Sequence, residues 1–223
     1  MTPTKPDKPK PLRERDQIWQ PQVTRLSSIA EIRMGVTLRG RDATRPVPSG
    51  SYRLVRIGDI SQDGTLVNEE FVCIEPRQSV SEELILRSGD VLFPNRGTRT
   101  TALAYRLDQG RTIAGAQFFV LRPETTRVLP EYLAWFLRTE EAANYFAGKR
   151  KGTYVQIIER KDLADLAMPL PPLAVQKKIV AAAALAAEER NLSEQLARMK
   201  WSLTNGQLLQ AAGSSGGDKA ISI

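Results

Sequence analysis

Three short basic segments contain the side chains in this chain that are best suited to contact a polyanion. The first lies between residues 33 and 56, the second spans residues 95–101 and the third spans residues 149–153. A guanidinium can hold O6 and N7 of guanine together, an asparagine amide can do the same for adenine, and threonine can donate to phosphate. The candidate DNA contacts are Arg39, Arg41, Arg45, Asn95, Arg96, Thr98, Arg99, Thr100, Lys149, Arg150, Lys151 and Thr153.

A charged loop is most often only a solvated loop, so each basic segment by itself carries little weight. Each of the three contains a glycine, and together they occur in a chain with a formal net charge of +7 and a pI near 9.7. A strongly basic balance favours a polyanionic partner. The combination therefore predicts double-stranded DNA as the ligand.

Catalytic groups are sparse by comparison. The chain has no histidine and one cysteine, Cys73, which excludes Ser-His-Asp and Cys-His catalysis as well as His-ligated or Cys-cluster metal sites. Glu159-Arg160-Lys161 matches half of a magnesium-dependent nuclease site, and Asp90 is the partner carboxylate to consider. That short pattern is common by chance, and neither a phosphate-binding loop nor a base-methylation motif occurs. The sequence therefore predicts no catalytic activity and no cofactor, with a nuclease as the minor alternative.

The composition predicts a cytoplasmic protein with one folded domain and appendages. A length of 223 residues with 41% hydrophobic residues is enough for one core. No apolar run approaches the 18 or so residues that a membrane helix needs, and we expect no signal peptide. Cys73 lies in a strand-like run and is predicted to be a buried structural thiol.

The elements that must position the basic segments read as an α+β domain. Short strand candidates with turn signals between them run from residue 52 to residue 121, including 66–67 and 101–107. Before them, residues 19–36 carry an apolar residue at each third or fourth position, which is helical spacing. Pro130 is expected to begin a helix that continues to about residue 147 and packs on the sheet, followed by a strand at 154–158 and a turn at 159–163. Residues 1–17 are predicted to be a disordered basic arm, and 18–172 the domain.

The C-terminal part of the sequence predicts one long helix. Pro171 and Pro172 follow a short strand at 166–170, and residues 173–211 lack proline and are rich in Ala, Leu, Gln, Lys and Glu. Apolar residues recur with coiled-coil spacing, broken only at Glu189. Such a stripe needs a partner, and we expect two copies to pair through Leu185, Leu192, Leu196, Met199 and Leu203. Residues 212–223 are predicted to be a disordered tail.

Four runs in this order resemble the target recognition domain of the specificity subunit of type I restriction-modification systems. They are LSSIAEI (26–32), VRIGDI (55–60), LRSGDVLF (86–93) and MPLPPLAVQKKI (168–179), of which the last is the most specific. The resemblance covers roughly residues 19–209. It implies a non-catalytic subunit that directs a separate DNA methyltransferase and, where present, a restriction subunit.

In the family that this sequence resembles, two recognition domains and two long helices form one subunit. The paired helices set the distance between the two halves of a split DNA target. This chain contains one domain and one helix and looks like a half-size form. We therefore expect a homodimer that reads an inverted repeat. The alternatives are a single-domain DNA-binding or adaptor module of another phage-defence system and the nuclease.

Overall fold

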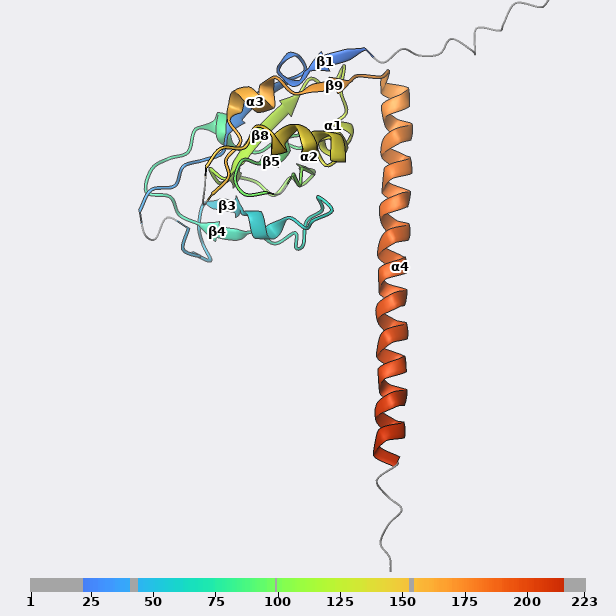
Figure 1. The fold of residues 1–223 in the computed structure, drawn as a ribbon. Coiled ribbons are helices and arrows are strands. Elements are labelled where there is room, and N and C mark those ends of the chain that lie inside the picture. The colour runs from blue at the N-terminus through green and yellow to red at the C-terminus, as the bar shows by residue number, and fades with distance from the viewer. Residues whose placement is uncertain (1–21, 41–43, 99, 153–154, 215–223) are drawn as a thin grey trace, which may run out of the picture.

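The protein consists of a β-rich head followed by one long helix, α4 (Figure 1). The structure is a computed structural model that describes residues 22–40, 44–98, 100–152 and 155–214. The predicted α+β architecture is confirmed. The predicted arm at 1–17, the tail from residue 215 onward and the candidate contacts Arg41, Arg99 and Thr153 lie outside the described residues.

A four-stranded antiparallel sheet forms the centre of the head. Its strands lie in the order β2 (Ala30–Met34), β8 (Phe118–Pro123), β5 (Val91–Pro94) and β6 (Leu103–Ala104). Successive residues of a strand point to opposite faces. Phe93 and Leu121 therefore enter the core under the helices, whereas Leu92 and Val120 enter the core on the other face. Burial on both faces explains why β5 and β8 are almost continuous apolar runs.

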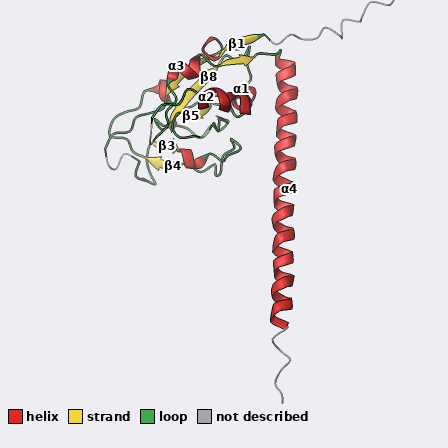
Figure 2. Cartoon of the chain, viewed as in Figure 1, coloured by secondary structure: helices red, strands yellow, loops and turns green. Residues whose placement is uncertain are grey.

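Two short helices cover one face of this sheet, and a second sheet packs on the other. The helices are α1 (Pro130–Leu137) and α2 (Glu140–Ala147), and the ring centroid of Phe146 lies 5.0 Å from that of Phe93. The second sheet has the order β4 (Val72–Ile74), β3 (Tyr52–Val55) and β7 (Thr112–Ala114), with β3 and β7 parallel. Figure 2 shows this division of the head into helical and strand layers.

A small third sheet joins the N-terminal and C-terminal strands of the head. β1 (Val23–Arg25) pairs antiparallel with β9 (Ala167–Pro169), directly before the hinge prolines. Short helical turns, Leu26–Ser28, Ile57–Asp59 and Glu82–Leu84, and the helix α3 (Arg160–Ala164) complete the head. The pairing of β1 with β9 fixes the point from which α4 leaves.

The helical spacing of residues 19–36 does not correspond to an α-helix in the described part of this range. Residues 23–34 form β1, a helical turn and β2. Within β2, Ala30 and Ile32 are buried and Glu31 is exposed, so the strand periodicity of two applies. Pairing with β8 and β9, both distant in sequence, overrides the local pattern.

Several other predictions need correction. The helix expected at 130–147 is two helices, because it breaks after Leu137 and the Thr139 side chain caps α2 by accepting from the Ala142 N–H. The predicted strand at 66–67 is only a bridge between Ile60 and Leu66, and the strand at 101–107 shortens to β6. The expected turn at 159–163 contains α3.

Two further corrections concern the strand predicted at 154–158 and the thiol of Cys73. Of the strand expected at 154–158, Tyr154 is outside the described residues, and Ile157 makes only isolated bridges. Cys73 is half-buried in β4 and so is not the fully buried thiol that was predicted.

The C-terminal helix α4 (Leu173–Ser214) has 42 residues and is about 63 Å long at 1.5 Å per residue. It begins where predicted but continues past residue 211, through Gly213. Figure 1 shows that it lies beside the head only in its first part and extends far beyond it. No helix in the described part of the chain combines the length and apolar character that a bilayer crossing requires.

Candidate nucleic-acid interface

The first two basic segments and the turn before β8 lie at one common end of the central sheet. β2 ends at Met34, β5 ends at Pro94 and β8 begins at Phe118; the register places Met34 opposite Phe119 and Pro94 opposite Phe118. The chain after β2, the chain after β5 and the turn before β8 therefore start side by side. We call this the loop end of the head.

Glycines allow the chain after β2 to cross close to the turn before β8. The Gly35 N–H donates to Phe118 at 2.9 Å, and the Val36 N–H donates to Ala114 at 2.7 Å. A Cβ atom at Gly35 would lie 2.2 Å from the Gly115 carbonyl oxygen. Only glycine fits this crossing, which keeps the loop after β2 against the turn before β8.

The second and third basic segments are bonded to each other. The Gly97 N–H donates to the Gln156 carbonyl at 2.8 Å, and the Ile158 N–H donates to the Asn95 carbonyl at 2.9 Å. The Arg150 guanidinium also donates to the Thr98 carbonyl at 2.9 Å. Although they are some 50 residues apart in sequence, these loops form one surface.

The first basic segment lies beside the same turn. Leu38, Thr44 and Arg56 line a cavity of about 400 Å³ together with Ala116 and Gln117 of the turn before β8. The Asn95 N–H in turn donates to the Gln117 carbonyl at 2.9 Å. The turn thus links the first segment to the other two, and the three basic segments meet around it.

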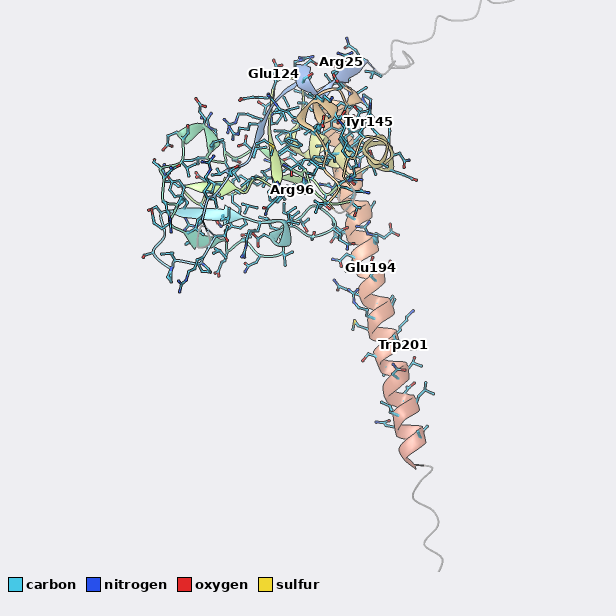
Figure 3. All side chains as sticks on the ribbon, turned by 60° about the vertical axis from the view of Figure 1, so that its left-hand side comes forward. Arg25, Arg96, Glu124, Tyr145, Glu194 and Trp201 are labelled. Carbon is cyan, nitrogen blue, oxygen red and sulfur yellow. The ribbon has the colours of Figure 1, made fainter. Side chains whose placement is uncertain are left out.

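Most described candidate contacts are accessible at this end. Arg39, Arg45, Arg96, Thr98, Lys149 and Lys151 are exposed, and Thr100 and Arg150 are half-buried. Figure 3 shows Arg96 near the middle of the head, with Glu194 and Trp201 on α4 beyond it. The Nζ atom of Lys149 lies 5.8 Å from the centroid of the Tyr145 ring, which orients that side chain.

Asn95 is the exception and requires a correction. Its residue is only 2% exposed, and its side-chain amide donates to the Ala116 carbonyl at 2.9 Å. An amide engaged in this way does not face a base edge. Asn95 positions the loop instead, because it joins the end of β5 to the turn before β8.

Three arginines of the first segment stabilise the fold. Arg33 pairs with the buried Asp90 at 3.3 Å, Arg53 donates to the Gln109 carbonyl, and Arg56 lies 3.6 Å from Asp59. Burial lowers the pKa of Arg33. The runs of arginine in the sequence do not separate these roles from DNA contact, because the distinction depends on distant partners.

The two carboxylates considered for a nuclease do not meet. Asp90 is buried before the first residue of β5 and pairs with Arg122 at 2.8 Å, whereas Glu159 lies beyond the opposite end of that strand. Hydrogen bonds from Lys151 and Lys161 lower the pKa of Glu159. Among the described residues, no three Asp, Glu, Cys or His side chains are grouped to hold a metal ion.

The junction between the head and α4 depends on one glutamine. Gln176 is fully buried, and its side-chain oxygen accepts from the Leu129 N–H at 2.8 Å. Its amide nitrogen donates to the carbonyls of Arg127 at 2.8 Å and Pro171 at 2.7 Å. The glutamine of the P-L-P-P-L-x-x-Q run therefore ties the start of α4 to the hinge and to the residues before α1.

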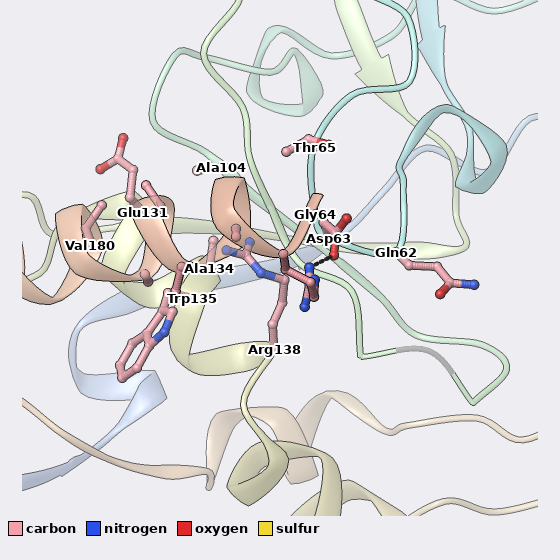
Figure 4. Close-up of a pocket in the computed structure, with 15 residues that line it drawn as sticks. Gln62, Asp63, Gly64, Thr65, Ala104, Glu131, Ala134, Trp135, Arg138 and Val180 are labelled. Atoms are coloured by element: carbon pink, nitrogen blue, oxygen red, sulfur yellow. Dashed lines mark hydrogen bonds and ion pairs between the residues drawn. The ribbon is translucent and has the colours of Figure 1, made fainter. Parts of the chain in front are cut away.

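Further along, α4 touches the head through a shallower contact. Ala183, Ala187 and Arg190 face a cavity of about 630 Å³, which Asp63 and Trp135 line from the head side. Arg190 forms an ion pair with Asp63. Figure 4 shows Asp63, Trp135, Arg138 and Val180 around this cavity.

The residues of α4 that are predicted to pair face away from the head. Ala183 faces the head, and Leu192 follows it by nine residues, which is about two and a half helical turns. Leu192 is therefore on the opposite side of the helix. The five predicted pairing residues are all exposed, namely Leu185, Leu192, Leu196, Met199 and Leu203.

A β-rich head with basic loops at one end of its central sheet, followed by one long protruding helix, defines the class of this fold. A family model described as "Type I restriction modification DNA specificity domain" matches residues 19–183. The chain belongs to this family. The resemblance found in the sequence is thereby confirmed.

Several solved structures have a similar fold. The HsdS subunit from Thermoanaerobacter tengcongensis is 24% identical with a TM-score of 0.59, over 91% of this chain and 51% of that chain. A chain from a type I R-M system assembly is 20% identical with a TM-score of 0.59, over 85% and 45%. The S subunit from M. genitalium is 14% identical with a TM-score of 0.52, over 80% and 42%.

This chain thus spans about half the length of the structures that it matches. A search of curated protein sequences finds no match.

Proposed function

We propose that this protein is a non-catalytic specificity subunit that reads one half of a bipartite DNA target and pairs with a second copy through α4. In this role it directs a separate DNA methyltransferase subunit and, where one is present, a restriction subunit. The observation that supports it best is the meeting of three basic loops at one end of the sheet in a DNA specificity domain.

The chemistry of the loop end suits duplex DNA. Arg39, Arg45, Arg96 and Lys149 are exposed cations on neighbouring loops, and threonine hydroxyls lie among them. Cations fix the head on the phosphates, and a guanidinium that reaches a base edge adds sequence preference. Arg41, Arg99 and Thr153 remain candidate contacts on the same loops.

Pairing through α4 follows from the position of its apolar stripe. The five exposed residues Leu185, Leu192, Leu196, Met199 and Leu203 lie on the side opposite the head, so a second helix meets no obstruction there. A stripe left in water is unfavourable, whereas interdigitation with an identical stripe buries it. A two-fold pair of heads reads an inverted repeat.

Replacing Arg96 by alanine tests the DNA surface. If the guanidinium contacts a base, Arg96→Ala should relax the preference at one position by about 1–3 kcal/mol; if it contacts phosphate, it should weaken all duplexes alike. Binding is measured at fixed salt against a library of randomised duplexes. Arg25→Ala is the control, because the exposed Arg25 lies in β1, at the opposite end of the head. Equal affinities of wild type and Arg96→Ala would remove this loop from the interface.

Methylation mapping tests the role of the subunit. A source genome with the gene present should carry a methylated inverted repeat that disappears when the gene is deleted. A pattern that is unchanged by deletion would contradict the proposal. Sequence-specific binding without any dependent methylation would instead favour a DNA-binding module of another phage-defence system.

A further inference from the structure

We propose that Ile157 reads the methyl group of a thymine in the DNA target, between two cations that contact the flanking phosphates. This inference rests on the proposed function and adds a specificity-determining residue to it. The sequence alone does not single out Ile157, because an isoleucine in a strand-like run normally belongs to a core.

The position of Ile157 between two cations comes from backbone pairing. Ile157 forms an antiparallel bridge with Arg96 on one side and with Lys151 on the other. Residues directly opposite each other in antiparallel pairs extend their side chains from the same face. Arg96, Ile157 and Lys151 therefore form a row across one face of the loop end, and all three are exposed.

Ile157 is exposed to solvent and does not belong to the core. The next residue, Ile158, is buried in the main core cluster, whereas Ile157 is exposed. Ile157 is 41% exposed, and Val155 and Met34 beside it at the loop end are 53% and 44% exposed. The Sδ atom of Met34 lies 3.5 Å from the Asn95 amide, and the Asn95 carbonyl accepts from the Ile158 N–H, so Met34 and the segment that carries Ile157 both adjoin Asn95.

Charge decides which partner fits this patch. Arg96 and Lys151 flank Ile157, and Lys149 and Arg150 precede Lys151 in the same loop. Glu159 pairs with Lys151 at 2.8 Å and with Lys161 at 3.3 Å, so that group keeps a net positive charge. Cations on both sides of a small apolar patch match a DNA groove, where phosphates border the base edges. The apolar feature of a base edge in the major groove is the thymine methyl group.

Replacing thymine by uracil in the DNA isolates this contact. Uracil keeps every hydrogen-bonding group of thymine and lacks only the methyl group. Wild-type protein is first used to select its preferred site from randomised duplexes. Each thymine of that site is then replaced by uracil in turn, and the affinity is measured at constant salt. One replacement should weaken wild-type binding about 4-fold, the effect of one buried methylene-sized group.

The same scan with Ile157→Ala completes a double-substitution cycle. This variant should bind the thymine site about 4-fold more weakly than wild type and show no further loss with uracil at that position. Ile157→Val should keep a partial preference for thymine. Val67→Ala, at another exposed apolar residue, should retain the wild-type uracil profile. Circular dichroism and urea midpoints establish that each variant is folded.

The outcomes separate this inference from the function on which it rests. If wild type selects no sequence, the proposed function fails. If it selects a site but no uracil position weakens binding, or if Ile157→Ala retains the uracil penalty, the Ile157 contact is wrong and the function stands. If Ile157→Ala leaves DNA binding unchanged and weakens methyltransferase binding, the patch is a protein-docking surface and the contact is also wrong.

Discussion

At the scale of single residues, buried polar groups decide how the head is held to its helix. Gln176 is fully buried, and all three of its hydrogen bonds join α4 to backbone groups elsewhere. Tyr132 is also buried, and its hydroxyl donates to the Pro169 carbonyl at 2.8 Å, just before the hinge. Gln176 links the residues before α1 to the hinge, and Tyr132 links α1 itself to the strand before the hinge.

Replacing Gln176 by alanine should lower the free energy of unfolding by about 2–4 kcal/mol, because the backbone groups of Leu129, Arg127 and Pro171 all lose their partner in this partly buried network. Urea-induced unfolding followed by circular dichroism measures the loss. Gln195→Ala, at an exposed position of the same helix, should change stability by less than about 0.5 kcal/mol. Equal effects of the two substitutions would show that the buried network does not stabilise the junction.

Burial raises the pKa of Tyr132 to about 12, with a smaller contribution from Glu141. A tyrosine in the unfolded chain loses its proton near pH 10. Because the folded state holds the proton more tightly, this contribution to stability is fully present below about pH 10 and is lost as the pH rises toward 12. Urea unfolding between pH 9 and pH 11.5 should therefore show a declining free energy.

Tyr132→Phe removes both the titration and the hydrogen bond. Its unfolding free energy should be about 1 kcal/mol lower near pH 9 but should fall less steeply above pH 10 than that of wild type. An identical slope in the two proteins would mean that Tyr132 does not contribute to the alkaline loss.

At the scale of elements, α4 is fixed to the head at its start and contacts it again at Arg190. Gln176 fixes the first turn, Ile179 and Val180 pack against the core, and Arg190 pairs with Asp63 on a loop of the head. Beyond Arg190 the helix leaves the head (Figure 1). The angle between head and helix depends on these contacts and on the stiff pair Pro171-Pro172.

The ion pair of Arg190 should matter for geometry more than for stability. Because both partners are exposed, Arg190→Ala should change the free energy of unfolding by less than about 1 kcal/mol. It should nevertheless widen the range of half-site spacings that the protein accepts, measured by binding to duplexes that differ only in spacer length. Replacement of Pro171 and Pro172 by alanine should act in the same direction.

Arg198→Ala is the matched control for Arg190. Arg198 pairs with Glu194 within the helix at 3.7 Å, so its ion pair does not involve the head. If Arg190→Ala and Arg198→Ala give the same spacing profile, the contact with Asp63 does not set the angle.

At the scale of the whole molecule, the head and the pairing stripe lie on opposite sides of one helix. Trp201 follows Leu192 by nine residues and so lies on the side opposite the stripe, as Ala183 does. We expect two copies joined through the stripe to place their heads on the outside. The spacing between half-sites would then follow from the length of paired helix.

Aspartate at Leu192 and Leu196 should convert a dimer into a monomer, because it places charges within the paired stripe. Sedimentation equilibrium at tens of micromolar measures the mass. Trp201→Ser, which removes an equally exposed apolar side chain from the other side of α4, should leave the dimer intact. A wild-type chain that stays monomeric at these concentrations would overturn the pairing.

Local sequence determined the elements whose signals lie within a few residues. The proline pair, the proline-free run after it and the regular spacing of Leu192, Leu196, Met199 and Leu203 were sufficient to predict α4, because helix formation depends on neighbours three and four residues apart. The runs that form β5 and β8 were likewise predicted as strands. The basic loops were recognisable as candidates from their composition alone.

Only the tertiary structure decided which of these side chains share a surface. Met34 meets Phe119, and Arg96 meets Ile157, across long stretches of chain, and no local pattern records such pairing. The same long-range contacts bury Asn95, assign Arg33 to Asp90 and turn the helical spacing of residues 23–34 into strands. Their energy comes from burial and hydrogen bonds between distant segments, which outweigh the small preferences of single residues.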